Sequence, residues 1–314
     1  MVAAALAASY VLVLVLELNP TVPLVTEHVW PLVATVGVYY TVHLTVLAYM
    51  LLVARQIFAR ELFSPAWVSV GVLVWLGAAA AATGSVLMWR NLWTFALVLD
   101  EHSARALAWS AFALAVAALS FALVGVLRRA SPDARRVWAP ALAIVMAASV
   151  AVPLALRGPG VPPRLDARPI DTSLETVALE RAARVTIIAV DGASLDYITS
   201  ATAEGRLPNF GRMLDGGAVR HLATLHPTSP EAVWAAVATG KLPQKNGVHS
   251  AGLYRVARRR DGSMPLQLLP DYCFAHGLVR FGFLIEEAHT SATFRTRTLW
   301  SILSASGITV GMVG

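Results

Sequence analysis

The chain has 314 residues, of which 57% are hydrophobic and 14% are charged, and its mean hydropathy is +0.62. A soluble domain carries about 25% charged residues, so this composition excludes an ordinary soluble protein. The net charge of +6 divides evenly around residue 157, which excludes the clustered basic face of a nucleic-acid-binding protein. Cys273 is the only cysteine, which excludes an intrachain disulfide and a cysteine-rich metal site.

Five apolar segments are long enough, or nearly so, to cross a bilayer, which takes about 20 residues per helix. They cover residues 2–18, 30–53, 67–87, 106–126 and 137–156. The only charged residue within them is Glu17, at the end of the first segment. That segment is short, but it lacks the charged start and small-residue cleavage site of a signal peptide. We therefore predict a transmembrane region over residues 1–157 with five helices.

The distribution of arginine predicts how this region is oriented. The second connection carries Arg55 and Arg60, and residues 128–136 of the fourth carry four arginines. The first connection has no basic residue, and in the third the arginines are offset by acidic residues. Because positive charge is retained in the cytoplasm, we expect a cytoplasmic N-terminus and an extracytoplasmic segment after residue 156. The cell membrane of a bacterium suits this arrangement.

His43 lies within the second apolar segment and raises the alternative of a transporter, since intramembrane ionisable residues are often functional. Apart from Glu17 at the end of the first segment, the apolar segments contain no second acid or base to relay protons, and they lack paired breaks of the kind found in transporters. The sequence therefore favours a neutral histidine packed between helices.

Residues 158–184 begin with proline and glycine and are predicted to be a linker, with a polar helix over 172–183. Strand and helix patterns then alternate, which is typical of an α/β domain with a parallel sheet. The predicted strands cover residues 185–190 and 218–225, and the predicted helices cover 194–205, 207–217 and 230–240. Residues 255–262, which include Arg258–Arg260, are most simply a solvated loop or hairpin.

Asp191 directly follows the predicted strand 185–190 and precedes Gly192. Ligand groups collect at the carboxyl ends of parallel strands, so this carboxylate suits a metal ion. A turn aspartate that caps the next helix is an equally simple interpretation, and the residue alone leaves both open.

Thr228 and Ser229 precede a helix in the stretch "TSPE". The pattern is that of a capping box, with a hydroxyl at the N-cap, proline at the first position and Glu231 at the third. The same geometry places a hydroxyl at the positive end of a helix dipole, which stabilises an alkoxide or a phosphate oxygen. The pair therefore fits both a cap and a catalytic nucleophile.

Together these residues resemble the N-terminal part of the type I phosphodiesterase/nucleotide pyrophosphatase branch of the alkaline phosphatase superfamily. The shared elements are a strand ending in Asp-Gly, an "LPNF" segment ending in Gly-Gly, Thr-Ser-Pro before a Trp-containing helix, and "ATGKLPQKNGV". They cover roughly residues 185–250, and residues 298–314 resemble the next helix and strand of that family.

The resemblance implies that Asp191 is a metal ligand and that Thr228 is the metal-bound nucleophile, with Ser229 as its rival. It also implies two divalent ions, zinc in most members, that clamp the attacking and leaving oxygens. The fold expected is an alkaline phosphatase-like α/β domain over residues 185–314. The expected partners are membrane lipids and a phosphate-ester substrate. In one interpretation, this substrate is linked to a lipid.

Two departures from the family pattern affect these expectations. Asn246-Gly247 replaces a frequent His-Gly, and nearby His249 is either a substitute contact or a surface histidine. The later Asp-x-x-x-His and Asp-His-Gly motifs are absent, and His226, His276 and His289 lack such partners. We therefore expect a truncated catalytic domain that is inactive by itself.

The sequence predicts a membrane-bound, metal-dependent phosphodiesterase or phosphatase that acts outside the cytoplasm through a threonine nucleophile. A lipid head-group phosphotransferase of the same superfamily is one alternative. The other is a catalytically dead membrane anchor whose soluble part binds rather than cleaves.

Overall fold

The fold was analysed in a computed structural model of the chain. It describes residues 1–59, 70–130, 135–160, 184–220, 222–226, 228–257, 264–272 and 274–313. The predicted helix 172–183, most of the linker, Arg258–Arg260 and Cys273 lie outside these ranges.

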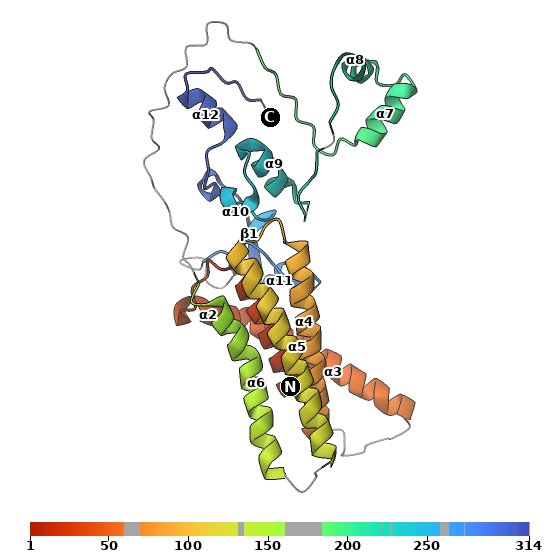
Figure 1. The fold of residues 1–314 in the computed structure, drawn as a ribbon, viewed down its shortest axis with the longest axis vertical. Coiled ribbons are helices and arrows are strands. Elements are labelled where there is room, and N and C mark those ends of the chain that lie inside the picture. Colours follow the sequence, from red (N-terminus) through yellow and green to blue (C-terminus); the bar gives the residue numbers. More distant parts are fainter. Residues whose placement is uncertain are drawn as a thin grey trace.

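A bundle of apolar helices forms the N-terminal half of the molecule (Figure 1). Its elements are α1 (Val2–Leu18), α2 (Thr26–Leu32), the π-helix η1 (Val33–Gly37), α3 (Val38–Ala59), α4 (Val70–Thr94), α5 (Glu101–Ala130) and α6 (Arg135–Arg157). The last four predicted spans each coincide with a helix long and apolar enough to cross a membrane. The 17-residue α1 is shorter, about 25 Å at 1.5 Å per residue, so the count of five is not confirmed.

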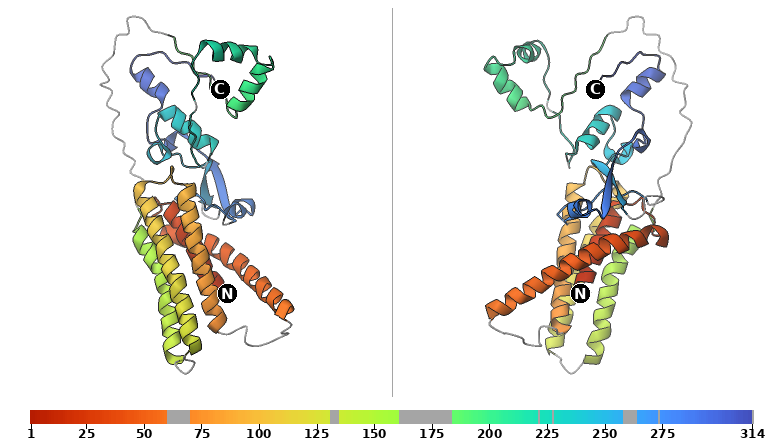
Figure 2. Two further views of the ribbon diagram at one scale, coloured as in Figure 1. Left: turned by 45° about the vertical axis from the view of Figure 1, so that its right-hand side comes forward. Right: turned by 180° about the vertical axis from the view of Figure 1, so that it is seen from behind.

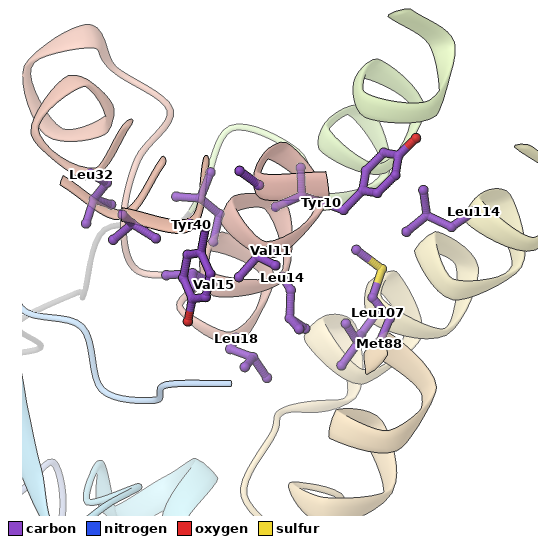
Figure 3. Close-up of a cluster of buried hydrophobic side chains, with 14 of the residues drawn as sticks. Tyr10, Val11, Leu14, Val15, Leu18, Leu32, Tyr40, Met88, Leu107 and Leu114 are labelled. Carbon is purple, nitrogen blue, oxygen red and sulfur yellow. The ribbon is translucent and has the colours of Figure 1, made fainter. Parts of the chain in front are cut away.

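Helix α1 is the centre of the bundle, and its residues are buried almost continuously from Tyr10 to Leu18. Figure 3 shows its side chains between those of α4 and α5 on one side and those of α2 and α3 on the other. Close approach depends on small residues: a Cβ added to Gly84 of α4 would lie 3.0 Å from Leu114 of α5. Small residues at such contacts are typical of helices that pack within membranes.

The two ends of the bundle differ in charge and in what they contact. The last turn of α5 carries Arg128 and Arg129, and this end of the helix lies far from the C-terminal segment (Figures 1 and 2). The C-terminal segment lies at the opposite end, where α4 ends and α5 begins. The arginine pattern predicts that the arginine-rich end of the bundle and the C-terminal segment lie at opposite ends. Which side of the membrane each end faces stays a prediction.

Arg157, the last residue of α6, is buried and caps the end of α1. Its Nε donates to the carbonyl of Leu16 at 2.7 Å, and its Nη2 donates to the carbonyls of Asn19 and Val22 at 3.0 and 2.5 Å. The last carbonyls of a helix have no partner within it, and burying them unpaired is costly. The guanidinium therefore satisfies the end of α1 at a place that is closed to water.

Asn19, one residue beyond α1, connects the bundle to the C-terminal segment. Its Nδ2 donates to the carbonyls of Val15 and Leu268 at 2.7 and 2.8 Å. Its Oδ1 accepts from the backbone N–H groups of Gln267 and Leu268 at 2.6 and 3.0 Å. Asn19 is only 1% exposed. Its side-chain amide pairs with the backbone of residues 267–268 in the way that a neighbouring β-strand would.

Within the described residues, the C-terminal segment consists of short helices and a two-stranded sheet. The helices are α7 (Leu195–Ala203), α8 (Pro208–Gly216), α9 (Pro230–Thr239), α10 (Pro243–Asn246), α11 (Ala275–Arg280), the 3₁₀-helix η3 (Ser291–Thr293) and α12 (Leu299–Ala305). Strands β1 (Gly252–Val256) and β2 (Leu284–Ala288) pair in antiparallel fashion. The helices predicted from the sequence over 194–240 are confirmed.

The predicted strands 185–190 and 218–225 are wrong for the described residues, and the parallel sheet is not formed there. Residues 185–190 are extended but unpaired, and the Ile188 side chain is 74% exposed. Leu222 in the second segment is 91% exposed. An apolar, β-branched run indicates a preference for a pleated surface, but a strand exists only when a neighbour satisfies its backbone groups.

His43 also differs from the prediction, because its side chain is exposed rather than packed between helices. Its Nδ1 lies 2.7 Å from the carbonyl of Tyr39 in its own helix, and the two rings are 4.2 Å apart.

Replacing Asn19 with alanine should loosen the attachment of the C-terminal segment. The N–H groups of Gln267 and Leu268 would lose their acceptor, so hydrogen exchange in a peptide spanning residues 264–272 should accelerate. Asn209→Ala, on exposed helix α8, is the matched control and should leave that peptide unchanged. Equal protection in the wild type and in Asn19→Ala would contradict the role given to this side chain.

Candidate functional site

Asp191 lies on an exposed turn after the extended segment 184–190. Its Oδ1 accepts from the N–H of Gly192 at 3.0 Å, and Gly192 has a φ of 68°, a conformation that favours glycine. The N-cap of α7 is Ser194, whose hydroxyl accepts from the N–H of Tyr197. The capping role that the sequence left open for Asp191 is therefore taken by another residue, and its carboxylate faces solvent.

Thr228 and Ser229 lie where the chain enters α9. Ser229 is the N-cap and Pro230 occupies the first helical position. Glu231 is consequently at the second position rather than the third, so the predicted capping box does not form. The Ser229 hydroxyl instead donates to the Glu231 carboxylate at 2.8 Å, and the Thr228 hydroxyl donates to the carbonyl of Leu225 at 3.1 Å.

The start of α9 is open for an anionic group. No side chain caps the helix, and Pro230 has no N–H, so the next N–H groups of the first turn point outward beside the two hydroxyls. A helix N-terminus carries a partial positive charge that favours anions. Thr228 is exposed and Ser229 is half-buried, so both hydroxyls can be reached from solvent.

Asp191 and Thr228 are not assembled into a metal centre within the described residues. No group of three or more His, Cys, Asp or Glu side chains there could hold a metal ion. Each of the two residues is a suitable oxygen ligand by itself. Nothing in the described ranges completes a coordination shell around either of them. The donor set present in these residues does not fit the two ions that the resemblance implies.

The loop after α9 is held by Asn246, the residue that replaces a frequent histidine of the family pattern. Asn246 is fully buried, its Nδ2 donates to the carbonyl of Lys241 at 2.8 Å, and its Oδ1 accepts from the N–H of Val248 at 2.8 Å. Its carbonyl accepts from the N–H of Arg295 at 2.9 Å. From the sequence, position 246 is only a departure from the family pattern. In the structure, the side chain of Asn246 closes the turn.

Gly247, which follows Asn246, is required by the same turn. Its φ is 89°, and a Cβ there would lie 2.7 Å from the carbonyl oxygen of Thr293. The loop 246–250 therefore packs directly against residues 293–295.

His249 belongs to this loop, and its Nδ1 is buried without a hydrogen-bond partner among the described residues. Burial lowers the pKa of His249 from 6.5 to about 4, with a further contribution from the positive charge of Arg295. His289 lies nearby, and its Nε2 donates to the carbonyl of Ser250 at 2.8 Å. The His249 side chain is half-buried, so it differs from a fully exposed surface histidine, while a substrate contact stays a prediction.

His226 and His276 are exposed. Neither is brought into a ligand cluster with other described residues.

Comparison with known proteins gives one match. Residues 185–313 match the family model described as type I phosphodiesterase / nucleotide pyrophosphatase. No curated protein and no solved structure matches the chain. The match begins at the extended segment before Asp191 and includes α9 with its two hydroxyls.

The burial of His249 predicts a pH-dependent stability. Because its pKa is lower in the folded than in the unfolded state, the folded protein binds fewer protons. The contribution of neutral His249 to the free energy of unfolding should be fully present above about pH 6.5, the usual pKa of histidine. It should be lost progressively as the pH falls toward 4. The melting temperature of the detergent-purified protein, measured between pH 7.5 and pH 5, checks this.

Two variants test the assignment to His249. His249→Gln should flatten the fall in melting temperature, while His226→Gln, on an exposed residue, should leave the profile unchanged. An unaltered profile in His249→Gln would assign the pH dependence to other groups.

Proposed function

We propose that this chain, whose residues 185–313 match the family model described as type I phosphodiesterase / nucleotide pyrophosphatase, is part of a membrane-bound phosphodiesterase with Thr228 as its nucleophile. The family match supports a hydrolase of phosphoric esters. The observation that carries the finer proposal is the pair of accessible hydroxyls at the uncapped start of α9, inside the matched region.

The chemistry follows from the hydroxyl and its surroundings. The Thr228 oxygen attacks the phosphorus of a diester and forms a new P–O bond, while the bond to one ester alcohol breaks. The hydroxyl proton leaves with that alcohol. Water then attacks the phosphothreonine, restores the hydroxyl and releases a phosphate monoester, so atoms and charge balance over the two steps.

The start of α9 would stabilise the charge that develops in these steps. Outward N–H groups at a helix N-terminus are fixed donors for phosphate oxygens and need no rearrangement during the reaction. Ser229 is the rival nucleophile, and its hydroxyl already donates to Glu231 at 2.8 Å. In that alternative the carboxylate would accept the proton of the attacking group.

Metal dependence remains part of the proposal, with Asp191 as one ligand and divalent ions, zinc foremost, as the group bound. Such ions would polarise the phosphoryl oxygens and lower the pKa of the hydroxyl. Because the described residues do not complete such a site, we derive no step from it.

The apolar helices support a substrate that resides in or near a membrane. Four of them are long and apolar enough to cross one, and the matched region is attached to one end of the bundle through Asn19. We propose an extracytoplasmic location for this region and a lipid-linked phosphate ester as substrate. Transfer of the phosphoryl group to an alcohol in place of water would make the protein a head-group phosphotransferase.

The nucleophile is tested by hydrolysis of bis-p-nitrophenyl phosphate by the purified natural full-length product. Thr228→Ala should lower kcat at least about 1,000-fold, as loss of a covalent nucleophile does, while Ser229→Ala should retain most activity. The reverse pattern would assign the nucleophile to Ser229. Absence of hydrolysis and of a trapped phosphothreonine in the wild type would favour the membrane-anchor alternative.

Chelation tests the metal. Dialysis against a chelator should abolish ester hydrolysis, and added zinc should restore it. Asp191→Asn should raise the zinc concentration needed for half-maximal activity, because one charged ligand is replaced by a neutral oxygen. Asp196→Asn, on exposed helix α7, is the matched control. Full activity after complete chelation would rule out the metal-dependent mechanism.

A further inference from the structure

The junction between the bundle and the C-terminal segment contains a cavity of about 680 Å³. It lies between the end of α4 and residues of α11, β1 and β2. We propose that this cavity binds the headgroup of a membrane phospholipid, with Arg280 and His276 at the phosphate. The proposal rests on the membrane location given above, but not on the nucleophile or the metal.

The cavity has the size and composition of a ligand site. Ligand pockets have volumes of about 300–1,000 Å³ and combine apolar walls with a few polar groups. Phe95 of the bundle, together with Leu269, Pro270 and Val279 of the C-terminal segment, supplies apolar wall. The site is made from both parts of the chain and lies at the end of α4, a helix long and apolar enough to cross a membrane.

The charged groups suit a zwitterionic phosphate ester. His276 and Arg280 are four residues apart on α11, so they share one helix face, and both line the cavity and are exposed. Glu286 on β2 also lines it, with the Tyr254 hydroxyl 3.5 Å from its Oε1. A guanidinium is well suited to phosphate recognition, while the carboxylate can accept hydrogen bonds from an ammonium group.

The rim of the cavity is held in a strained conformation by the bundle. Tyr272 and Phe274 have φ values of 60° and 52°, which is unusual for bulky residues. The Arg90 guanidinium lies 3.8 Å from the centre of the Tyr272 ring, and Asn91 Oδ1 accepts from the N–H of Asp271 at 2.9 Å. Such strain persists only where the surroundings enforce it, and it gathers at ligand sites.

Exposed aromatic residues adjoin the cavity-lining residues along the chain, which suits a position at the level of a membrane interface. Tyr272, Phe274 and Phe281 are each more than 60% exposed, and so is Trp93 near the end of α4. Aromatic residues concentrate at the headgroup level of bilayers. The hydroxyl of Tyr39 in α3 donates to the carbonyl of Phe274 at 3.4 Å, which ties this exposed aromatic patch to a second helix of the bundle.

The test measures binding without turnover, using short-chain phosphatidylethanolamine and inorganic phosphate as probes of the full chain in detergent. The phospholipid should bind, and Arg280→Gln should weaken it at least tenfold, whereas Arg280→Lys should retain most of the affinity. Arg212→Gln, an exposed arginine on α8, is the matched control and should bind like the wild type. Equal binding by wild type and Arg280→Gln would overturn the proposal.

Two further outcomes are decisive. Inorganic phosphate bound as tightly as the phospholipid would assign the cavity to free phosphate and overturn the lipid assignment. Thr228→Ala should bind the phospholipid normally, so loss of hydrolysis and loss of lipid binding are separate results. A failure of the phosphodiesterase proposal would therefore leave this measurement interpretable.

Discussion

The structure depends on how the end of α1 is satisfied. This helix is surrounded by other helices, so its last carbonyls cannot reach water. The Arg157 guanidinium donates to the carbonyl of Leu16 at the end of α1 and to those of Asn19 and Val22 just beyond it. One residue further, Asn19 offers both halves of its amide to the backbone at residues 267–268. Hydrogen bonds to a buried charged group are worth about 1.5–3 kcal/mol each. The same polar cluster thus closes the bundle and fixes the C-terminal segment on it.

The C-terminal segment is hydrogen-bonded to the bundle along only part of its length, and this affects the proposed function. Residues 264–283 are tied to α1, α3 and α4 by Asn19, Tyr39 and Asn91, and they form the junction cavity. The candidate nucleophiles lie on α9, which contacts α10 and α12. Asp191 lies on an extended, exposed stretch. A lipid held at the junction would therefore be bound by the most firmly anchored part of the segment, while the proposed chemistry belongs to the part beyond it.

Whether this protein is an enzyme or a binding protein depends on the role of the first turn of α9. A serine N-cap whose hydroxyl donates to a nearby carboxylate, next to an exposed threonine, leaves the N–H groups of the first turn free for an anion. A purely structural cap would have consumed one of them. The match of residues 185–313 to a family of phosphoric ester hydrolases supports the proposal that the open helix start takes part in catalysis. The transporter alternative finds no support in His43, which faces outward from α3.

The sequence by itself determined the helices and the candidate residues. Apolar runs, the proline at the start of α9 and Gly240 at its end act within a few residues, so α3 to α9 fall close to where the patterns placed them. The parallel sheet and the contact of Asn246 with Arg295 were decided by tertiary structure. A strand needs a neighbour distant in sequence, and the partners of Asn19 lie almost 250 residues away. Local propensity cannot encode such pairings, because they depend on where the rest of the chain packs.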